Sequence, residues 1–184
     1  MTVIKEEQNI SDNQMALDFA NGNKEAFDLL LKRFSPRLRS FLSRRVPNPS
    51  DVEDILQDTF LKVYLNIESF DPKYKFSCWI FTIASRNAIN HSRTKTPKPL
   101  DIKFEIVSQI NEPFEEMIDQ EQKLNLWTEA RKLETKQYSA LYLKYSEDFT
   151  TEEIAKTLNT TKLNVRVLLH RARNNLMKIT QKED

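Results

Sequence analysis

The chain of 184 residues carries 28 basic and 27 acidic side chains, which leave a net charge of +1 at pH 7. Its single glycine, Gly22, excludes glycine-rich phosphate loops and nucleophile elbows, and its single cysteine, Cys78, excludes an internal disulfide and a CxxC site. Low glycine content with abundant Leu, Lys, Glu and Arg predicts an all-α chain. No apolar run is long enough to cross a bilayer and the N-terminus lacks signal-peptide features, so we expect a cytoplasmic protein without membrane insertion.

The first part of the chain is predicted to form helices separated by turn residues. Polar residues 1–11 are expected to be disordered. A helix is then expected from about Asn13 to Gly22, because glycine is a common residue just after a helix end. Asn23 can cap the next helix, which Pro36 is expected to bend or restart and which ends before Pro47.

An acidic helix follows, in which Ser50 and Glu53 have the spacing of a capping box. Residues 51–64 place a set of apolar side chains on one side of this helix. Another face carries four side chains within about two turns: Asp54, Gln57, Asp58 and Leu61. That face is either a solvated acidic surface or a docking surface for a basic partner, and the periodicity alone favours neither.

Aromatic and basic side chains alternate in a turn predicted at 69–75 and along a helix predicted at 76–93. They include Phe70, Lys73, Tyr74, Lys75, Phe76, Trp79, Phe81, Arg86, His91 and Arg93, and the amides Asn87 and Asn90 lie among them. Aromatic rings can stack on unpaired bases while Lys and Arg hold the phosphate backbone. The alternative is a core aromatic cluster beneath a solvated cationic face. Core packing is favoured for Trp79 and Phe81, and nucleic-acid contact for the basic side chains.

The rest of the chain contains a linker and a C-terminal pair of helices. Residues 94–119 contain three prolines and no helical period, which is typical of a flexible linker between domains. Near the C-terminus, Thr150 or Thr151 is expected to cap a short helix, Asn159 begins a polar turn, and a basic helix is expected from about Lys162 to Met177. No acidic residue occurs from 154 to 182. This pattern predicts a DNA-binding helix-turn-helix whose second helix enters the major groove, the alternative being a solvated basic helix.

The two histidines, His91 and His170, fall in different predicted domains, and neither has a second ligand nearby in the sequence. We therefore expect no metal or cofactor. No nucleophile and base form a recognisable pair, so we expect no enzymatic activity and no small-molecule substrate.

Four segments together resemble one known family. They are GNKEAFDLLLKRF (22–34), DVEDILQDTFLKVY (51–64), ESFDPKYKFSCWIFTIA (68–84) and TTEEIAKTLNTTKLNVRVLLHRARNNL (150–176). In this order, with a linker between the third and the fourth, they resemble bacterial RNA-polymerase sigma factors of the extracytoplasmic-function (ECF) type, in the sigma-70 family. The resemblance covers most of the chain.

The resemblance implies two small helical domains joined by the flexible linker 94–119. Residues 12–93 would form sigma region 2, residues 120–178 would form region 4, and residues 179–184 would be a tail. In region 2, the face expected to dock on the coiled coil of the polymerase β′ subunit comprises Asp54, Gln57, Asp58 and Leu61. The resemblance thus favours docking over a merely solvated acidic face.

The resemblance also implies two DNA-binding surfaces. In region 2, the −10 element would be melted and held, with one flipped base captured by the turn, through Ser69, Phe70, Lys73, Lys75, Phe76, Trp79, Arg86, Asn87, Asn90 and Arg93. In region 4, whose leading helices would meet the polymerase β flap, the −35 element would be read through Lys162, Asn164, Arg166, Val167, His170, Arg171 and Arg173.

The function implied is that of a sigma factor, which binds core RNA polymerase, directs it to promoter DNA and promotes melting, under control of an anti-sigma factor. The alternative is a stand-alone helix-turn-helix regulator with an N-terminal sensor domain. The sequence departs from the family pattern in both predicted DNA-binding domains, and Asn90 stands where the family has a later Asp. Arg86 stands where the family usually has Asn, with Asn87 one place late, and the apolar residues Leu163 and Leu168 lie on or beside the predicted reading helix.

Overall fold

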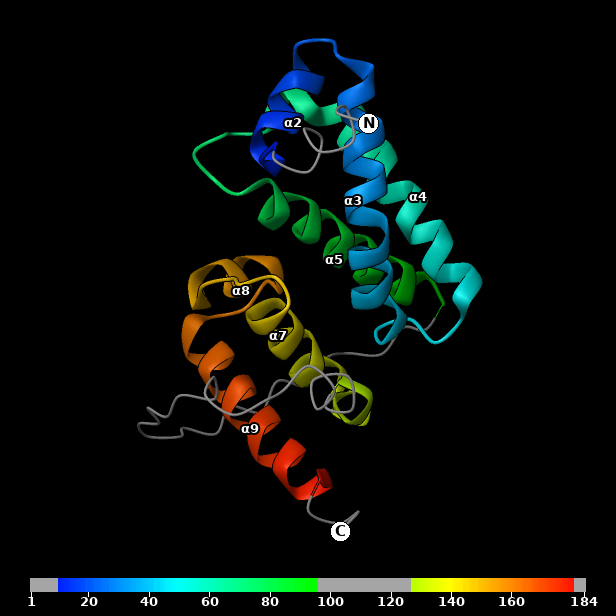
Figure 1. The fold of residues 1–184 in the computed structure, drawn as a ribbon. Helices are drawn as coiled ribbons and strands as arrows, with labels where there is room; N and C mark the ends of the chain where they lie inside the picture. Colours follow the sequence, from blue (N-terminus) through cyan, green and yellow to red (C-terminus); the bar gives the residue numbers. More distant parts are fainter. Residues whose placement is uncertain (1–9, 96–126, 181–184) are drawn as a thin grey trace, which may run out of the picture. The chain divides into compact units, whose positions relative to one another are not determined.

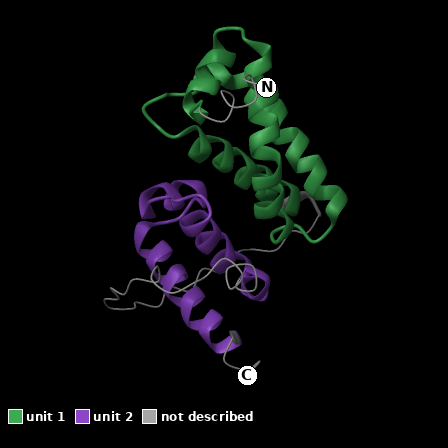
Figure 2. Ribbon diagram, in the orientation of Figure 1, with its two compact units in different colours: residues 1–98 green, residues 99–184 purple. Residues whose placement is uncertain are grey.

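The computed structural model describes residues 10–95 and 127–180, and these contain helices and no strand. The chain divides into two compact units, residues 1–98 and 99–184 (Figure 2). The predicted all-α fold with two helical domains is confirmed, while the predicted domain limits stay predictions. The linker predicted at 94–119 lies almost wholly outside the described residues, as do most of the N-terminal segment 1–11 and of the tail 179–184.

The described residues of unit 1, 10–95, form four helices and a short 3-10 turn. They are α2 (Asp12–Ala20), α3 (Lys24–Ser43), α4 (Pro49–Asn66), the 3-10 turn Ile67–Ser69 and α5 (Phe76–Lys95) (Figure 1). Each of α2, α4 and α5 packs against α3. The core is aromatic, since Phe34 and Phe41 of α3 meet Phe76 and Phe81 of α5 edge to face, both pairs with ring centroids 5.3 Å apart. All four rings are fully buried.

The helix ends of unit 1 follow the capping rules. The Ser11 hydroxyl accepts from the Gln14 amide at the start of α2, and Asn23 caps α3 as predicted. Gly22 follows the end of α2 with a φ of 96°, in the left-handed region that glycine favours. The capping box predicted at Ser50 is wrong, because the cap of α4 is Asn48, whose side chain accepts from the Ser50 amide.

Pro36 does not restart the second helix, since α3 continues through it from Lys24 to Ser43. Proline removes the backbone donor that would bond to the carbonyl of Lys32. One residue earlier, the Ser35 hydroxyl donates to the carbonyl of Leu31, at 2.6 Å. Phe34 and Leu38 on either side are fully buried. Packing on both sides of the proline therefore keeps one continuous helix where local propensity favours a break.

Unit 2 contains α7 (Thr135–Tyr145), α8 (Thr151–Thr157) and α9 (Lys162–Thr180). Thr150 caps α8 through a complete capping box with Glu153. Asn159 then takes a left-handed conformation, with φ 51°, and the Thr161 hydroxyl accepts from the Asn164 amide at the start of α9. The predicted helix-turn-helix geometry is therefore present. Among the described residues, no helix is long and apolar enough to cross a membrane.

Candidate nucleic-acid and protein interfaces

The four side chains predicted to dock on a partner all lie exposed on α4: Asp54, Gln57, Asp58 and Leu61. Large apolar side chains continue this face towards the end of the helix, where Tyr64 is 46% exposed and Leu65 is 69% exposed. An acidic and apolar surface of this kind is typical of a protein interface, because isolated monomers rarely expose several large apolar side chains together.

A groove between α3 and α4 adjoins this surface. Gln57, Leu61 and Tyr64 of α4 line it together with Phe27 and Leu31 of α3. The Phe27 ring packs against Tyr64, with ring centroids 5.3 Å apart, which fixes one wall of the groove. The groove gives an apolar partner side chain a place to insert beside the carboxylates.

The turn between the 3-10 segment and α5 stands on three packed rings. Phe70, Phe76 and Trp79 have ring centroids 5.4 to 5.7 Å apart. Phe76 is fully buried and Phe70 nearly so, whereas Trp79 is half-buried. Both phenylalanines therefore support the turn from the core, and only Trp79 of these three offers a ring near the surface.

The outer side of the turn is cationic. Lys73 and Lys75 are exposed, and Tyr74 between them is 59% exposed. The hydroxyl of Ser69, also exposed, donates to the carbonyl of Asn66, at 2.7 Å. Tyr74 is absent from the predicted −10 set, although its place between two lysines is the signal that marks an aromatic ring for stacking on a base.

On α5, Arg86 and Asn90 are exposed and lie one helical turn apart. Asn87 is different, because it is 7% exposed and its amide is used inside the unit. Its nitrogen donates to the Thr59 hydroxyl, at 3.1 Å, and its oxygen accepts from the Lys62 ammonium. In this structure Asn87 therefore links α5 to α4 and presents no free amide to DNA. The side chain of Arg93 lies outside the described residues.

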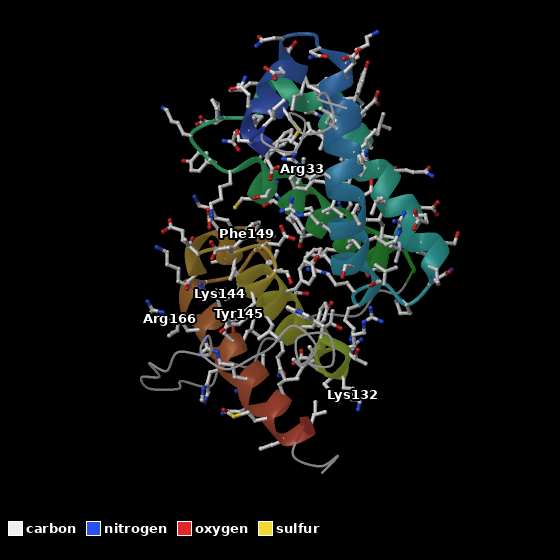
Figure 3. The ribbon with its side chains drawn as sticks, viewed as in Figure 1. Arg33, Lys132, Lys144, Tyr145, Phe149 and Arg166 are labelled. Carbon is white, nitrogen blue, oxygen red and sulfur yellow. The ribbon has the colours of Figure 1, made fainter. Side chains whose placement is uncertain are left out.

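The basic helix α9 presents a narrow outer face. Arg166 projects outwards from α9 and is exposed (Figure 3). Lys162 is also exposed, and Leu163 is 55% exposed. Val167 lies on the inner side of the helix and is only 8% exposed, which removes it from the surface offered to DNA in this structure. These three exposed residues lie in the first turns of α9, the part of a recognition helix that contacts base edges.

Several predicted −35 side chains have partners within unit 2. Lys162 pairs with Glu152 of α8, with Nζ and Oε2 2.6 Å apart, and this hydrogen bond and the Lys162 charge lower the pKa of the Glu152 carboxyl. Asn164 donates to the Thr160 hydroxyl, at 2.8 Å. His170 lies 3.0 Å from the amide nitrogen of Asn174, and the half-buried Arg171 lies beside it.

Arg173 is anchored to the body of unit 2. Its guanidinium donates to the Tyr145 hydroxyl of α7, with the shorter contact at 2.9 Å. It also lies over the ring of that tyrosine, 6.0 Å from the centroid. Arg173 thus joins α9 to α7, and Arg166 is left as the arginine of α9 with the most open position for a base contact.

Two family models match this chain. Sigma-70 region 2 matches residues 30–97, which include α4, the turn and α5, and Sigma-70 region 4 matches residues 123–176, which include α7, α8 and most of α9. The chain is 28% identical to the ECF RNA polymerase sigma factor SigW of Bacillus subtilis, over 85% of this chain and 90% of the relative. It belongs to the ECF sigma factors of the sigma-70 family.

Further relatives span nearly the same length as this sigma factor. The ECF RNA polymerase sigma-E factor of Escherichia coli is 27% identical, over 90% of this chain and 92% of the relative. Among solved structures, CnrH in complex with the cytosolic domain of CnrY has a TM-score of 0.62 at 22% identity, over 94% of this chain and 99% of that one. RpoE of Bartonella quintana in complex with the anti-sigma factor NepR has a TM-score of 0.61 at 21% identity, over 84% and 96%. These two likenesses show the shared fold.

The predicted family is therefore confirmed. As a sigma factor, the chain binds core RNA polymerase and acts in transcription initiation at promoters.

Proposed function

We propose that this sigma factor uses α4 to dock on core polymerase, the turn Ser69–Phe76 and α5 to hold the melted −10 element, and α9 to read the −35 element. One observation carries the proposal. Unit 1 exposes an acidic and apolar helix face and an aromatic-basic turn, while unit 2 exposes Arg166 on the second helix of a helix-turn-helix. A stand-alone regulator with a sensor domain uses only the last of these surfaces.

Binding to single-stranded DNA supplies the energy for melting in this proposal. Flipping a base costs a few kcal/mol of lost stacking, and contacts made only to the single strand shift the equilibrium towards the open state. Lys73, Lys75 and Arg86 are exposed and can hold the phosphates, while Phe70 and Phe76 support the turn from below. The chain would perform no catalytic step, since the polymerase carries out nucleotidyl transfer, and it would act in the cytoplasm.

Regulation by an anti-sigma factor fits the same surfaces. Leu61, Tyr64 and Leu65 leave large apolar area exposed on α4 when polymerase is not bound. A protein that covers this face would keep the sigma factor from polymerase, and we propose an anti-sigma factor in that role.

The test of the proposed function is transcription in vitro with the full chain, core RNA polymerase and fragmented genomic DNA. We expect discrete RNA 5′ ends that depend on the chain and share sequence elements near −10 and −35. An active core that gives no chain-dependent start, together with specific duplex binding by the chain alone, would establish the stand-alone regulator instead.

We also predict that Leu163 recognises the methyl group of a thymine in the −35 element. Leu163 is 55% exposed in the first turn of α9, three residues before Arg166, and apolar side chains read thymine methyls in the major groove. Replacing that thymine by deoxyuridine removes only the methyl group. We expect the affinity of the holoenzyme to fall about fourfold, the effect of exposing one buried methyl-sized group at ~0.8 kcal/mol.

The variant Leu163→Ser should bind thymine and deoxyuridine promoters equally, measured by fluorescence anisotropy. Met177→Ser is the matched control, because Met177 is 49% exposed at the far end of the same helix and should leave the deoxyuridine effect intact. If no thymine of the −35 element shows a deoxyuridine effect with the unmodified chain, Leu163 does not read a methyl group.

A further inference from the structure

The side chain of Asn13 holds the turn between the 3-10 segment and α5 in place. Its nitrogen donates to the carbonyl oxygens of Pro72, at 3.1 Å, and Tyr74, at 2.8 Å. Its oxygen accepts from the backbone amide of Phe76, also at 2.8 Å. One side chain of α2 thus bonds to both the middle and the end of a turn about sixty residues further along the chain. Both of the amide's donor hydrogens and one acceptor position are engaged.

Asn13 is itself held by rigid elements. Ser11 caps α2, and the carboxylate of Asp12 accepts from the guanidinium of Arg33, at 2.9 Å. Arg33 belongs to α3 (Figure 3). Arg33 also donates to the carbonyl of Ile10, at 2.9 Å. Met15, three residues after Asp12 in the same helix, is almost completely buried. The first turn of α2 is therefore fixed to α3, and Asn13 transfers that rigidity to the turn.

The bonds to Asn13 determine which groups of the turn face outwards. The carbonyls of Pro72 and Tyr74 face α2, while the side chains of Lys73, Tyr74 and Lys75 are exposed. The amide of Phe76 belongs to the first turn of α5, where backbone donors have no partner within the helix. Asn13 satisfies that donor from another helix and so also fixes where α5 begins.

We propose that Asn13 is a positioning residue for base capture: it holds the turn Ser69–Phe76 in the conformation that accepts a flipped base of the −10 element. The inference rests on the proposed function, since it concerns the turn assigned there to the −10 strand. Asn13 touches no DNA in this role and acts through the backbone of Pro72, Tyr74 and Phe76. A variant that lacks the Asn13 amide should therefore bind polymerase normally but capture the flipped base poorly.

The test uses holoenzyme formed from the full chain and core polymerase. The probes are labelled single-stranded oligonucleotides of the non-template −10 element from a mapped promoter, each with one nucleotide made abasic. With the unmodified chain, we expect one position at which loss of the base weakens binding about tenfold, the range for one stacked base. With Asn13→Ala, the ratio between abasic and intact probes at that position should fall to about one, while the affinity for core polymerase stays unchanged.

A second variant separates the hydrogen bonds from one another. Asn13→Asp keeps an acceptor for the Phe76 amide but loses both donated bonds, so it should fold with a normal start of α5 and still lose the abasic ratio. Gln14→Ala is the matched control, because Gln14 is exposed beside Asn13 and donates to Asp18 of its own helix. It should retain the tenfold ratio, and urea unfolding of all three variants gives their stability.

A full abasic ratio in folded Asn13→Ala or Asn13→Asp would overturn the positioning role. If the unmodified holoenzyme starts transcription at defined promoters but shows no position-dependent abasic effect, base capture by the turn is wrong, and the role of Asn13 with it. If it starts no transcription at all, the proposed function has failed at an earlier step.

Discussion

Replacing Asp54 and Asp58 by Lys is expected to weaken binding to core RNA polymerase by about a hundredfold or more. Both carboxylates are exposed on α4, beside the groove lined by Gln57 and Leu61. Losing one partner of a buried charge pair at a protein interface costs about 2–5 kcal/mol, and reversal also adds repulsion with a basic partner. Binding to core polymerase can be measured by fluorescence anisotropy with labelled sigma factor.

The effect should be confined to docking. Both substitutions lie in unit 1 and α9 lies in unit 2, so we expect duplex binding by α9 to survive. Asp28→Lys makes one such charge reversal, half the charge change of the double variant, at an exposed position of α3 and serves as the control for Asp54→Lys or Asp58→Lys alone. Unchanged core affinity in the double variant would remove the docking role from this face of α4.

Replacing Arg166 by Ala is expected to abolish discrimination at one base pair of the −35 element. A bidentate contact between Arg and guanine contributes about 1–3 kcal/mol of discrimination, which is about five- to 150-fold in relative affinity. Arg166 is the exposed arginine in the first turns of α9, whereas Arg173 is engaged with Tyr145. Competition binding of the holoenzyme to promoters with single base-pair changes measures the effect.

Two further variants define the specificity of that result. Arg171→Ala, at the half-buried neighbour of His170, should also reduce −35 discrimination. Lys178→Ala, at an exposed position near the end of α9, should lower affinity for all duplexes about equally, as expected for a phosphate contact. A promoter preference that is unaltered in Arg166→Ala would exclude this face from −35 readout.

Much of the fold could be predicted because local signals and tertiary packing agree. The caps at Asn23 and Thr150 and the turn at Asn159 lie where short-range side-chain chemistry places them. The predictions failed where tertiary packing, or competition between two possible capping residues, determines where a helix begins or ends. Asn48 precedes Pro49, which suits the first position of a helix, so the cap falls there and not at Ser50.

Glu53 does not form the predicted capping box and bonds instead to a residue of α3. Its two carboxylate oxygens accept from the guanidinium of Arg39, at 2.7 and 2.9 Å. This hydrogen bonding, with the Arg39 charge, lowers the pKa of the Glu53 carboxyl. A contact between residues fourteen apart in the sequence depends on how α3 and α4 pack, and capping patterns carry no information about it.

The candidate site was only partly accessible to sequence reasoning. The exposed acidic face of α4 follows from helical spacing alone. Asn87 could also have been placed in the core, because it lies seven residues after Ile80 and three after Ala84, both of which are fully buried. Asn13 could not have been found, since its three partners lie 59 to 63 residues away and all are backbone groups, which leave no trace in side-chain pattern.

The buried amide of Asn87 has a consequence for engineering promoter preference. Its oxygen and nitrogen bond to Lys62 and Thr59 of α4. The packing of α5, which carries Arg86 and Asn90, therefore depends on these two residues of α4. A chimaera that receives α5 of this protein without both α4 partners would carry an unsatisfied amide in its core, at a cost of about 1–3 kcal/mol. To transfer the −10 specificity of this protein to another sigma factor, α4 and α5 should therefore be moved together, with residues 59, 62 and 87 exchanged as a set.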